Sequence, residues 1–230
     1  AILKSVGAPV NEVVTEWEKA RHAIPMGSLN KAVNEAEFRQ WVARCDQLGV
    51  ESALVPIAND LLVTEKLDGL SLAVNYENGK LVEAITRGDG QVGERITSNA
   101  RRMKGVPARN RAAGTSKRFD GAGCEHLTVM FYDLEGGDTE HATEKEKYER
   151  LLQLGLIVPP FEVTDLEGAL RIHNEYSSKK RAELDYEIDG LVVRANDLRA
   201  QHLLGELGGR PRAAVAYKFA SLAKVSRVIA

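Results

Sequence analysis

The sequence predicts an α+β fold, with antiparallel sheets flanked by helices. Residues 69–86 read as a β-hairpin, because Leu70, Leu72, Val74 and Tyr76 occupy every second position before Asn78-Gly79, a strong hairpin signal, and residues 81–86 return as the second strand. Helix-start signals recur further along the chain, where Thr143 precedes Glu146 by three residues and Thr164 precedes Glu167 by the same spacing. Strand and helix signals that follow one another in this way indicate mixed layers.

The composition is that of a globular protein without a global basic field. A chain of 230 residues is enough for one large domain or two small ones. It is 43% hydrophobic and 28% charged, and its net charge of -2 does not point to nucleic acid. Residues 101–118 nevertheless contain seven lysines and arginines and no acidic residue. That run is either a solvated loop or a local DNA-binding patch.

Neither a protein metal site nor a membrane span is indicated. Cys45 and Cys124 are too few for a disulfide framework or a zinc site, and the five histidines have no metal-ligand spacing. No apolar run approaches the ~20 residues that a membrane span requires. We therefore expect a cytoplasmic, reducing environment, with Cys45 packed in the core.

Three helices are predicted with their buried faces. The first begins at Asn34, with Glu37 as its capping partner, and ends at Gly49; its apolar positions are Phe38, Trp41, Val42, Cys45 and Leu48. The helix that begins at Thr143 directs Tyr148, Leu151 and Leu152 to the core. The helix that begins at Thr164 directs Leu166, Leu170 and His173 to the core. We also expect a helix up to about Met103, and strands over residues 127–133, 184–195 and 214–219.

Lys66 is the centre of the candidate site, in the segment Thr64-Glu65-Lys66-Leu67-Asp68-Gly69. In an extended segment, residues two apart share a face, so Lys66 and Asp68 should point into the same space. A lysine on a rigid strand edge can be a nucleophile once its amine is neutral, which the ordinary pKa of ~10.4 opposes. The hairpin should bring Arg87 back near the level of Lys66, where a cation can bind phosphate and depress the amine pKa.

Three more motifs follow in order: Thr86-Arg87-Gly88-Asp89-Gly90, Asp189-Gly190-Leu191-Val192-Val193-Arg194 and Ala216-Tyr217-Lys218-Phe219. With Lys66-Leu67-Asp68-Gly69, this set resembles the covalent nucleotidyltransferases, and among them the adenylation domain of NAD-dependent DNA ligases. The resemblance extends from about Arg21 to Phe219. It implies the nucleotidyltransferase fold, with a nucleotide cleft between sheets and helices.

The resemblance also implies which residues contact the nucleotide. A family segment Pro-Met-x-Ser-Leu corresponds to residues 25–29, so Ser28 and Leu29 should line the pocket. Arg109 and Lys117 take the places of two family cations, Lys117 standing where arginine is common. The expected phosphate-neutralising groups are Arg87, Arg194 and Lys218, with Mg²⁺ as the metal aid.

The sequence departs from the family at three further places. The family has glutamate two residues before the lysine, near the adenine amine, but this chain has Thr64 there. Glu65 is the nearest carboxylate for that contact, although a shift of one residue reverses the face of a strand. Arg194 replaces a common lysine and cannot lose its proton. Between Val106 and Arg109 there is no room for a family strand whose Gly-Glu pair contacts the ribose; either the protein lacks it or residues have been lost there.

The implied activity begins with attack of Lys66 on the α-phosphorus of NAD, which forms lysyl-AMP. The AMP then passes to a DNA 5′-phosphate, and a 3′-hydroxyl displaces it to seal a nick. Asp68 would orient Lys66 or bind the ribose, and Asp189 would accept its proton or position a metal-bound water. The alternatives are an ATP-dependent ligase or capping-type transferase, and a degenerate nucleotide- or DNA-binding module without catalysis.

We expect an N-terminal helical part over residues 1–63, a nucleotidyltransferase core over residues 64–219 and the start of a linker over residues 220–230. The family's OB-fold domain and its small domain for nicotinamide mononucleotide have no counterpart in this sequence. They are expected in the same polypeptide or in a partner. The expected macromolecular partner is nicked double-stranded DNA, and not a membrane.

Overall fold

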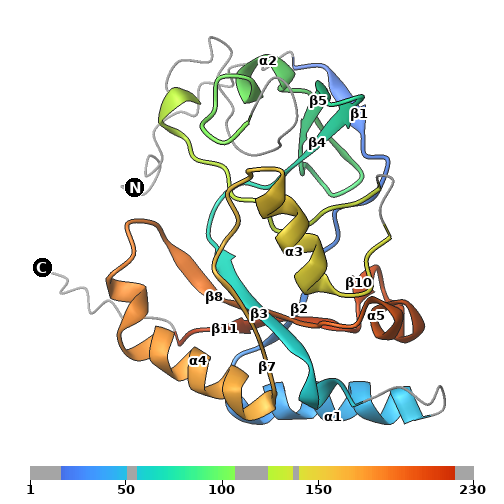
Figure 1. Ribbon diagram of the computed structural model, residues 1–230, viewed down its shortest axis with the longest axis vertical. Helices are drawn as coiled ribbons and strands as arrows, with labels where there is room; N and C mark the ends of the chain where they lie inside the picture. Colours follow the sequence, from blue (N-terminus) through green and yellow to red (C-terminus); the bar gives the residue numbers. More distant parts are fainter. Residues whose placement is uncertain (1–16, 51–55, 107–123, 137–139, 221–230) are drawn as a thin grey trace, which may run out of the picture. The chain divides into compact units, whose positions relative to one another are not determined.

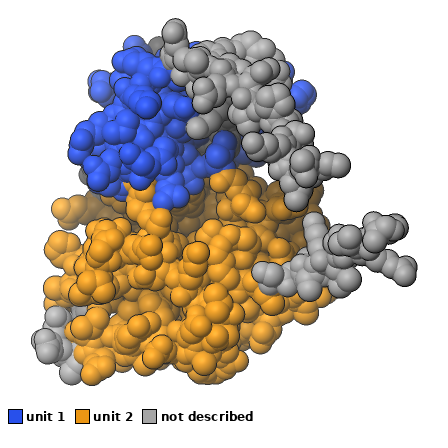
Figure 2. All heavy atoms as spheres, turned by 180° about the vertical axis from the view of Figure 1, so that it is seen from behind, with its two compact units in different colours: residues 1–25, 70–129 blue, residues 26–69, 130–230 orange. Residues whose placement is uncertain are grey.

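The computed structural model describes residues 17–50, 56–106, 124–136 and 140–220 (Figure 1). The chain divides into two compact units, coloured separately in Figure 2. Unit 1 comprises residues 1–25 and 70–129, and unit 2 comprises residues 26–69 and 130–230. Among the described residues, no helix has both the length and the apolar character needed to cross a membrane.

Unit 2 is built around a five-stranded sheet with the order β2-β11-β8-β3-β7. β2 and β11 are parallel, whereas the other three neighbouring pairs are antiparallel. The expected antiparallel sheet is therefore present, with one parallel pair at its edge. Its strands are β2 (Asn30–Ala32), β3 (Leu61–Leu67), β7 (Phe161–Thr164), β8 (Ile188–Ala195) and β11 (Ala214–Lys218).

Helices cover both faces of this sheet. Figure 1 shows α1 (Glu35–Val50) and α4 (Leu166–Ser178) on one face and α3 (Glu144–Gln153) on the other. The remaining elements of unit 2 are α5 (Leu198–Leu204), the short 3-10 helices η1 (Ile57–Asn59) and η3 (Lys180–Ala182), and the paired strands β9 (Glu206–Leu207) and β10 (Arg210–Pro211).

The alternation of side chains along the strands separates a core face from a polar face. Odd-numbered positions on three strands belong to one buried apolar cluster with α1 and α4: Leu61, Val63, Leu191, Val193, Val215 and Tyr217. Burying each large apolar side chain contributes roughly 1.5–3 kcal/mol. Since successive residues of a strand point to opposite faces, Lys66 and Lys218 lie on the other side, away from this core.

The helix-start signals are confirmed at two of three places. Asn34 Oδ1 accepts the backbone N–H of Glu37 at 2.9 Å, and Thr143 and Glu146 form a reciprocal capping box. The third expectation is wrong: Asp165, not Thr164, caps α4 by accepting the N–H of Gly168 at 2.7 Å. A carboxylate adjacent to the first helical residue is an equally good cap, so spacing alone could not choose.

Most expected core positions are buried, whereas Leu166 is half-buried and two are exposed. Cys45 is 3% exposed, and its burial raises the pKa of the thiol to about 12. His173 packs as expected, with its ring 3.6 Å from that of Tyr217 between centroids. Leu48 and Leu152 are 49% and 48% exposed, because each lies at the margin of its helix's apolar face.

Unit 1 contains the predicted hairpin. β4 (Leu72–Glu77) and β5 (Lys80–Thr86) pair in antiparallel fashion around Asn78-Gly79, whose φ angles of 47° and 73° fit the left-handed turn that this dipeptide favours. A second pair joins β1 (Lys19–Arg21) and β6 (Val92–Glu94). The other elements are α2 (Thr97–Ala100) and the 3-10 helix η2 (Cys124–His126).

Two expectations for regular structure are wrong, one for a helix and one for a strand. The helix expected up to Met103 is the single turn α2, because residues 92–94 pair with β1 instead. Residues 127–133 do not form a strand; one bridge between Thr128 and Lys104 is the pairing there. Val129 and Phe131 alternate because both are buried, which periodicity cannot distinguish from strand pairing.

Candidate active site

A β-bulge brings three predicted site residues together. Lys66 of β3 pairs with Gly190, whereas the next residue, Leu67, pairs with Ile188, so Asp189 is an extra residue of β8. A bulge re-aims the side chain of its extra residue. The Asp189 carboxylate consequently lies beside Lys66, with Lys66 Nζ 3.0 Å from Oδ1 and 3.3 Å from Oδ2.

Lys218 approaches the same carboxylate from β11. Gly190 is paired with Lys218 across the strands, and the Lys218 ammonium donates to Asp189 Oδ2. Gly190 permits this close packing, since a Cβ on it would lie 2.4 Å from the carbonyl oxygen of Tyr217. The Asp-Gly dipeptide of the motif thus has two separate roles, a carboxylate between two lysines and a close strand approach.

The two lysines control the ionisation of Asp189. Partial burial opposes the charged form, but the hydrogen bonds from Lys218 and Lys66 outweigh it and hold the pKa of this carboxyl below its usual value. All three side chains stay partly open, with 27% of Lys66, 31% of Asp189 and 22% of Lys218 exposed. The carboxylate therefore remains ionised at neutral pH, at a place that solvent can reach.

Two cations that the sequence analysis missed lie next to this group. Asp189 and Lys218 line a hollow of about 440 Å³ together with Lys31 of β2 and Arg181 of η3. Arg181 also lies over the ring of Phe219, 5.4 Å from its centroid. Lys31 lies two residues after Leu29 of the predicted nucleotide contact, and Arg181 belongs to the basic run 179–181 that precedes Asp189, so both had a sequence signal.

Asp68 and Glu65 do not accompany Lys66 as expected. β3 ends at Leu67, and Asp68 is exposed beyond it, so Asp189 is the carboxylate that contacts Lys66 in the described part of the chain. Glu65 is 4% exposed and faces α4, where it accepts hydrogen bonds from two tyrosines. This arrangement differs from the expected nucleotide contact by Glu65, because the one-residue shift from position 64 turns its side chain to the opposite face of the strand.

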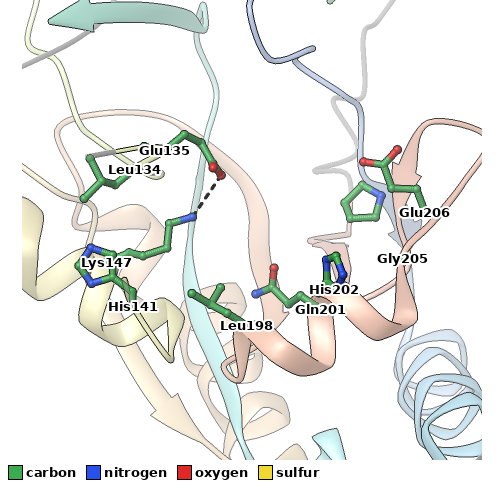
Figure 3. Close-up of a pocket in the computed structure, with 11 residues that line it drawn as sticks. Leu134, Glu135, His141, Lys147, Leu198, Gln201, His202, Gly205 and Glu206 are labelled. Atoms are coloured by element: carbon green, nitrogen blue, oxygen red, sulfur yellow. Dashed lines mark hydrogen bonds and ion pairs between the residues drawn. The ribbon is translucent and has the colours of Figure 1, made fainter. Parts of the chain in front are cut away.

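A larger cavity of about 600 Å³ lies between α5, residues 134–136 and the start of α3 (Figure 3). Its lining includes Glu135, His141, Lys147, Gln201 and His202. Figure 3 shows the ammonium of Lys147 directed at Glu135, which it contacts at 3.3 Å. None of the site residues predicted from the sequence lines this cavity.

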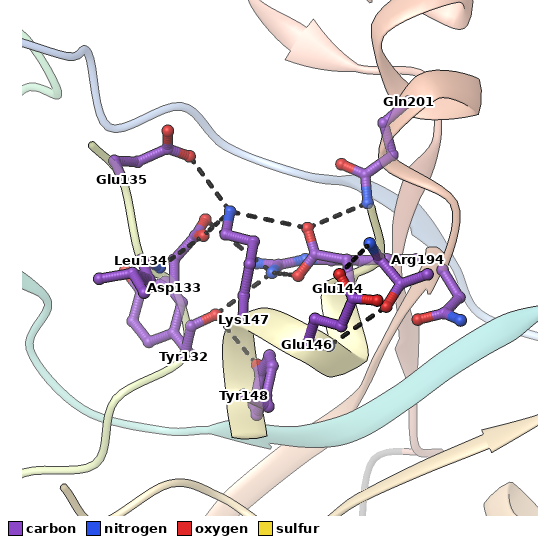
Figure 4. Close-up of polar contacts among 12 residues, drawn as sticks. Tyr132, Asp133, Leu134, Glu135, Glu144, Glu146, Lys147, Tyr148, Arg194 and Gln201 are labelled. Atoms are coloured by element: carbon purple, nitrogen blue, oxygen red, sulfur yellow. Dashed lines mark hydrogen bonds and ion pairs between the residues drawn. The ribbon is translucent and has the colours of Figure 1, made fainter. Parts of the chain in front are cut away.

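Arg194 belongs to a network of charges and not to the group around Lys66 (Figure 4). It pairs with Leu62 of β3, four residues before Lys66. Its guanidinium donates to Glu144 at 3.1 Å and to the carbonyl oxygen of Tyr132 at 3.2 Å. Burial opposes the charge, but Asp133 and Glu144 outweigh it and raise the pKa of Arg194. This geometry differs from the expected role at the phosphates, because Glu144 already compensates the charge.

The other predicted residues are divided among three places. Ser28 is exposed and Leu29 half-buried, directly before β2, whose Asn30 pairs with Val215 near the start of β11. Arg87 belongs to unit 1, whereas Lys66 belongs to unit 2, so its position beside Lys66 stays a prediction. Arg109 and Lys117 lie outside the described residues.

The chain resembles known proteins over nearly its full length. The family pattern described as the NAD-dependent DNA ligase adenylation domain matches residues 14–109 and 107–222. The two blocks meet where the sequence has no room for the expected Gly-Glu strand, between Val106 and Arg109. A DNA ligase of Sorangium cellulosum strain So ce56 is 45% identical over 275 residues, covering 100% of this chain and 40% of that relative.

Two further relatives agree with this. DNA ligases of Chelativorans sp. strain BNC1 and Wolbachia pipientis wMel are 31% and 32% identical, over 95% of this chain and 37% of each relative. The chain therefore spans only 37–40% of the length of these curated relatives. Because the family pattern covers most of its residues and these relatives match almost all of them, the chain belongs to the NAD-dependent DNA ligase adenylation domain family.

Proposed function

We propose that this chain performs the adenylation step of an NAD-dependent DNA ligase, in which Lys66 becomes covalently bound to AMP. One observation carries the proposal: the amine of Lys66 contacts a carboxylate that it shares with Lys218, beside a hollow that Lys31 and Arg181 also line. A nucleophile, a proton acceptor and several cations within one site are the groups that phosphoryl transfer requires.

The reaction begins with loss of a proton from Lys66. Asp189, which contacts Nζ, is the acceptor, because its two oxygens are already ionised and directed at the amine. The free electron pair of Nζ then attacks the α-phosphorus of NAD. A P–N bond forms, the P–O bond to the second phosphate breaks, and nicotinamide mononucleotide leaves with the bonding electrons.

Positive side chains stabilise the negative charge that spreads over the phosphate oxygens during this transfer. Lys218 is the best-placed cation, since it already lies on Asp189. Arg181 and Lys31 line the same hollow, and Arg87 is the candidate from unit 1. Ser28 and Leu29 would contact the nucleotide at the other end of β11. Four residues of a strand separate that end from Lys218, which at ~3.3 Å per residue is about 13 Å.

Mg²⁺ takes a limited part in this proposal. The described residues hold no group of three or more histidine, cysteine, aspartate or glutamate side chains that could bind a metal ion. Mg²⁺ typically binds through substrate phosphates and only one or two carboxylates. We therefore assign it to the phosphates of NAD, where it would withdraw charge from the α-phosphorus, and every residue role above stands without it.

The later steps concern DNA. The AMP passes from Lys66 to the 5′-phosphate of nicked double-stranded DNA, and a 3′-hydroxyl then displaces AMP to join the strands. The relatives are named DNA ligase, and this chain matches 37–40% of their length. We therefore propose that further ligase segments, in the same polypeptide or in a partner, hold the nicotinamide mononucleotide and the DNA.

Intact mass spectrometry tests the first step. The chain is incubated with NAD and Mg²⁺, and in parallel with ATP and Mg²⁺. We expect a mass increase of one AMP with NAD alone, with the adduct on Lys66, and no adduct in Lys66→Ala. Lys145→Ala, which changes an exposed lysine of α3, is the matched control and should react normally.

Each other outcome has a definite meaning. AMP transfer from ATP alone would replace the NAD assignment by an ATP-dependent ligase or capping-type transferase. Full labelling of Lys66→Ala on another lysine would remove Lys66 from its role. No adduct from either donor in the folded chain would favour a nucleotide- or DNA-binding module without catalysis.

A further inference from the structure

Glu65 is a buried carboxylate that the proposed reaction does not use. It is 4% exposed and lies on the core face of β3, next to Lys66 in sequence but opposite to it in direction. An ionised carboxylate in such a place is costly unless hydrogen bonds compensate it. Tyr176 donates to Oε1 at 2.8 Å and Tyr186 donates to Oε2 at 2.6 Å, so each oxygen has its own donor.

The two tyrosines come from different segments. Tyr176 lies in the last turn of α4, and Tyr186 lies in the segment that leads into β8, three residues before Asp189. Glu65 therefore ties both segments to β3 immediately beside the bulge. Just beyond the bulge, the backbone N–H of Asp68 also donates to the carbonyl oxygen of Glu187 at 2.9 Å.

The same contacts continue to Lys218. The ring of Tyr176 stacks on that of Phe219, with centroids 6.5 Å apart and an angle of 12° between the planes. Phe219 follows Lys218 directly, and its backbone N–H donates to the carbonyl oxygen of Asp189 at 3.1 Å. One continuous set of contacts thus runs from Glu65 to the strand ends that carry Asp189 and Lys218.

We infer that Glu65 is a positioning residue, which holds Lys66, Asp189 and Lys218 in register from the opposite face of the sheet. This inference rests on the proposed function of Lys66. Glu65 touches no reacting atom; it fixes the bulge that turns Asp189 toward the amine. Burial, and then the hydrogen bonds to Glu65, raise the pKa of Tyr176 and of Tyr186, so both remain protonated donors at neutral pH.

Glu65→Gln is the decisive variant, because it keeps the size of the side chain but has one acceptor oxygen in place of two. A small misplacement of reacting groups lowers a reaction rate by up to ~10²-fold. We therefore expect the rate constant of lysyl-AMP formation, measured at saturating NAD, to fall by at least about tenfold. The NAD concentration for half-maximal rate should change by less than about twofold, since no group that binds NAD is removed.

Single and double variants locate the effect. Tyr176→Phe and Tyr186→Phe each remove one donor and should each lower the rate constant by a smaller factor. In the Glu65→Gln background neither should lower it further, because contacts in one network are not additive. These two variants also carry the test if Glu65→Gln fails to fold.

The matched control is Trp41→Phe. It removes another buried hydrogen bond of unit 2, from Trp41 Nε1 to the carbonyl oxygen of Arg212 at 2.8 Å. It should lower the melting temperature but preserve the rate constant of the folded chain. Equal loss of rate in Trp41→Phe and Glu65→Gln would reduce Glu65 to a structural role and overturn the inference.

The inference and the proposed function fail in different ways. An unchanged rate constant in folded Glu65→Gln, with AMP still on Lys66 in the parent chain, overturns the inference alone. Absence of AMP on Lys66 in the parent chain overturns the proposed function, and the positioning role falls with it.

Discussion

At the scale of single residues, the site depends on one carboxylate between two ammonium groups. Asp189 contacts both Lys66 and Lys218, so the two lysines compete for the same negative charge. Both lysines lie on the same face of the sheet. In the proposed reaction we expect a phosphate of NAD to take over Lys218 and to leave Asp189 to Lys66 alone, so that the two lysines have different tasks.

Replacing Lys218 should separate rate from binding. We expect Lys218→Ala to slow lysyl-AMP formation on the order of 10²–10³-fold, because a preorganised donor acts mainly on the transition state. Binding of AMP, followed by calorimetry, should weaken much less. Lys145→Ala serves as control, since Lys145 is exposed and pairs with Glu149 on α3. Equal losses in rate and binding would make Lys218 a ground-state contact instead.

At the scale of elements, α4 supports the strand that carries Lys218. His173 of α4 stacks on Tyr217, its ring lies 5.1 Å from that of Phe219, and its Nε2 is 3.1 Å from the carbonyl oxygen of Lys218. One imidazole therefore contacts the residues on both sides of Lys218, Tyr217 of β11 and Phe219 directly after it. Burial lowers the pKa of His173, and the contact to Lys218 opposes this only in part.

This lowered pKa predicts a loss of stability in acid. The unfolded chain binds a proton at the ordinary histidine pKa of ~6.5, but the folded chain resists it until a lower pH. The stabilisation is fully present above ~6.5 and is lost as the pH falls through the lowered pKa. Urea unfolding from pH 8 to pH 5 should show this decline, and His173→Gln, which cannot titrate, should remove part of it. A decline of the same size in the variant would assign it to other groups.

At the scale of the whole molecule, this chain matches only part of the length of relatives that are named DNA ligase. It covers 40% of the Sorangium cellulosum ligase, and its net charge is -2. Phosphate contacts dominate the affinity for duplex DNA, and sealing requires a grip on both sides of a nick. The described basic residues of the run 101–118, such as Arg101 and Lys104, belong to unit 1, which does not contain Lys66.

We therefore expect that this chain by itself does not seal nicks with multiple turnover. A labelled nicked duplex is incubated with the chain, NAD and Mg²⁺, beside a chain already loaded with AMP. The expected product is at most a small amount of adenylylated or joined DNA from the loaded chain. Repeated sealing by the chain alone would show that these 230 residues hold every part that a ligase needs.

The local sequence was sufficient wherever the physical cause is local. Asn78-Gly79 determined the hairpin turn through its left-handed φ angles, and Thr143 with Glu146 determined the start of α3. The sequence also predicted a strand edge at Lys66 and a strand that contains Lys218, and the order of the motifs identified the family. Each of these signals involves neighbours in the chain or a pattern that repeats along it.

Only the tertiary structure decided which charges meet. Asp189 reaches Lys66 because a bulge shifts the register of β8, and a register shift is a property of two strands together. Arg194 donates a hydrogen bond to Glu144 of α3, 50 residues away in sequence. Glu65 accepts a hydrogen bond from Tyr176 of α4, 111 residues away. A side chain's partner in the fold depends on packing between distant segments, so spacing along the chain could name these residues but not pair them.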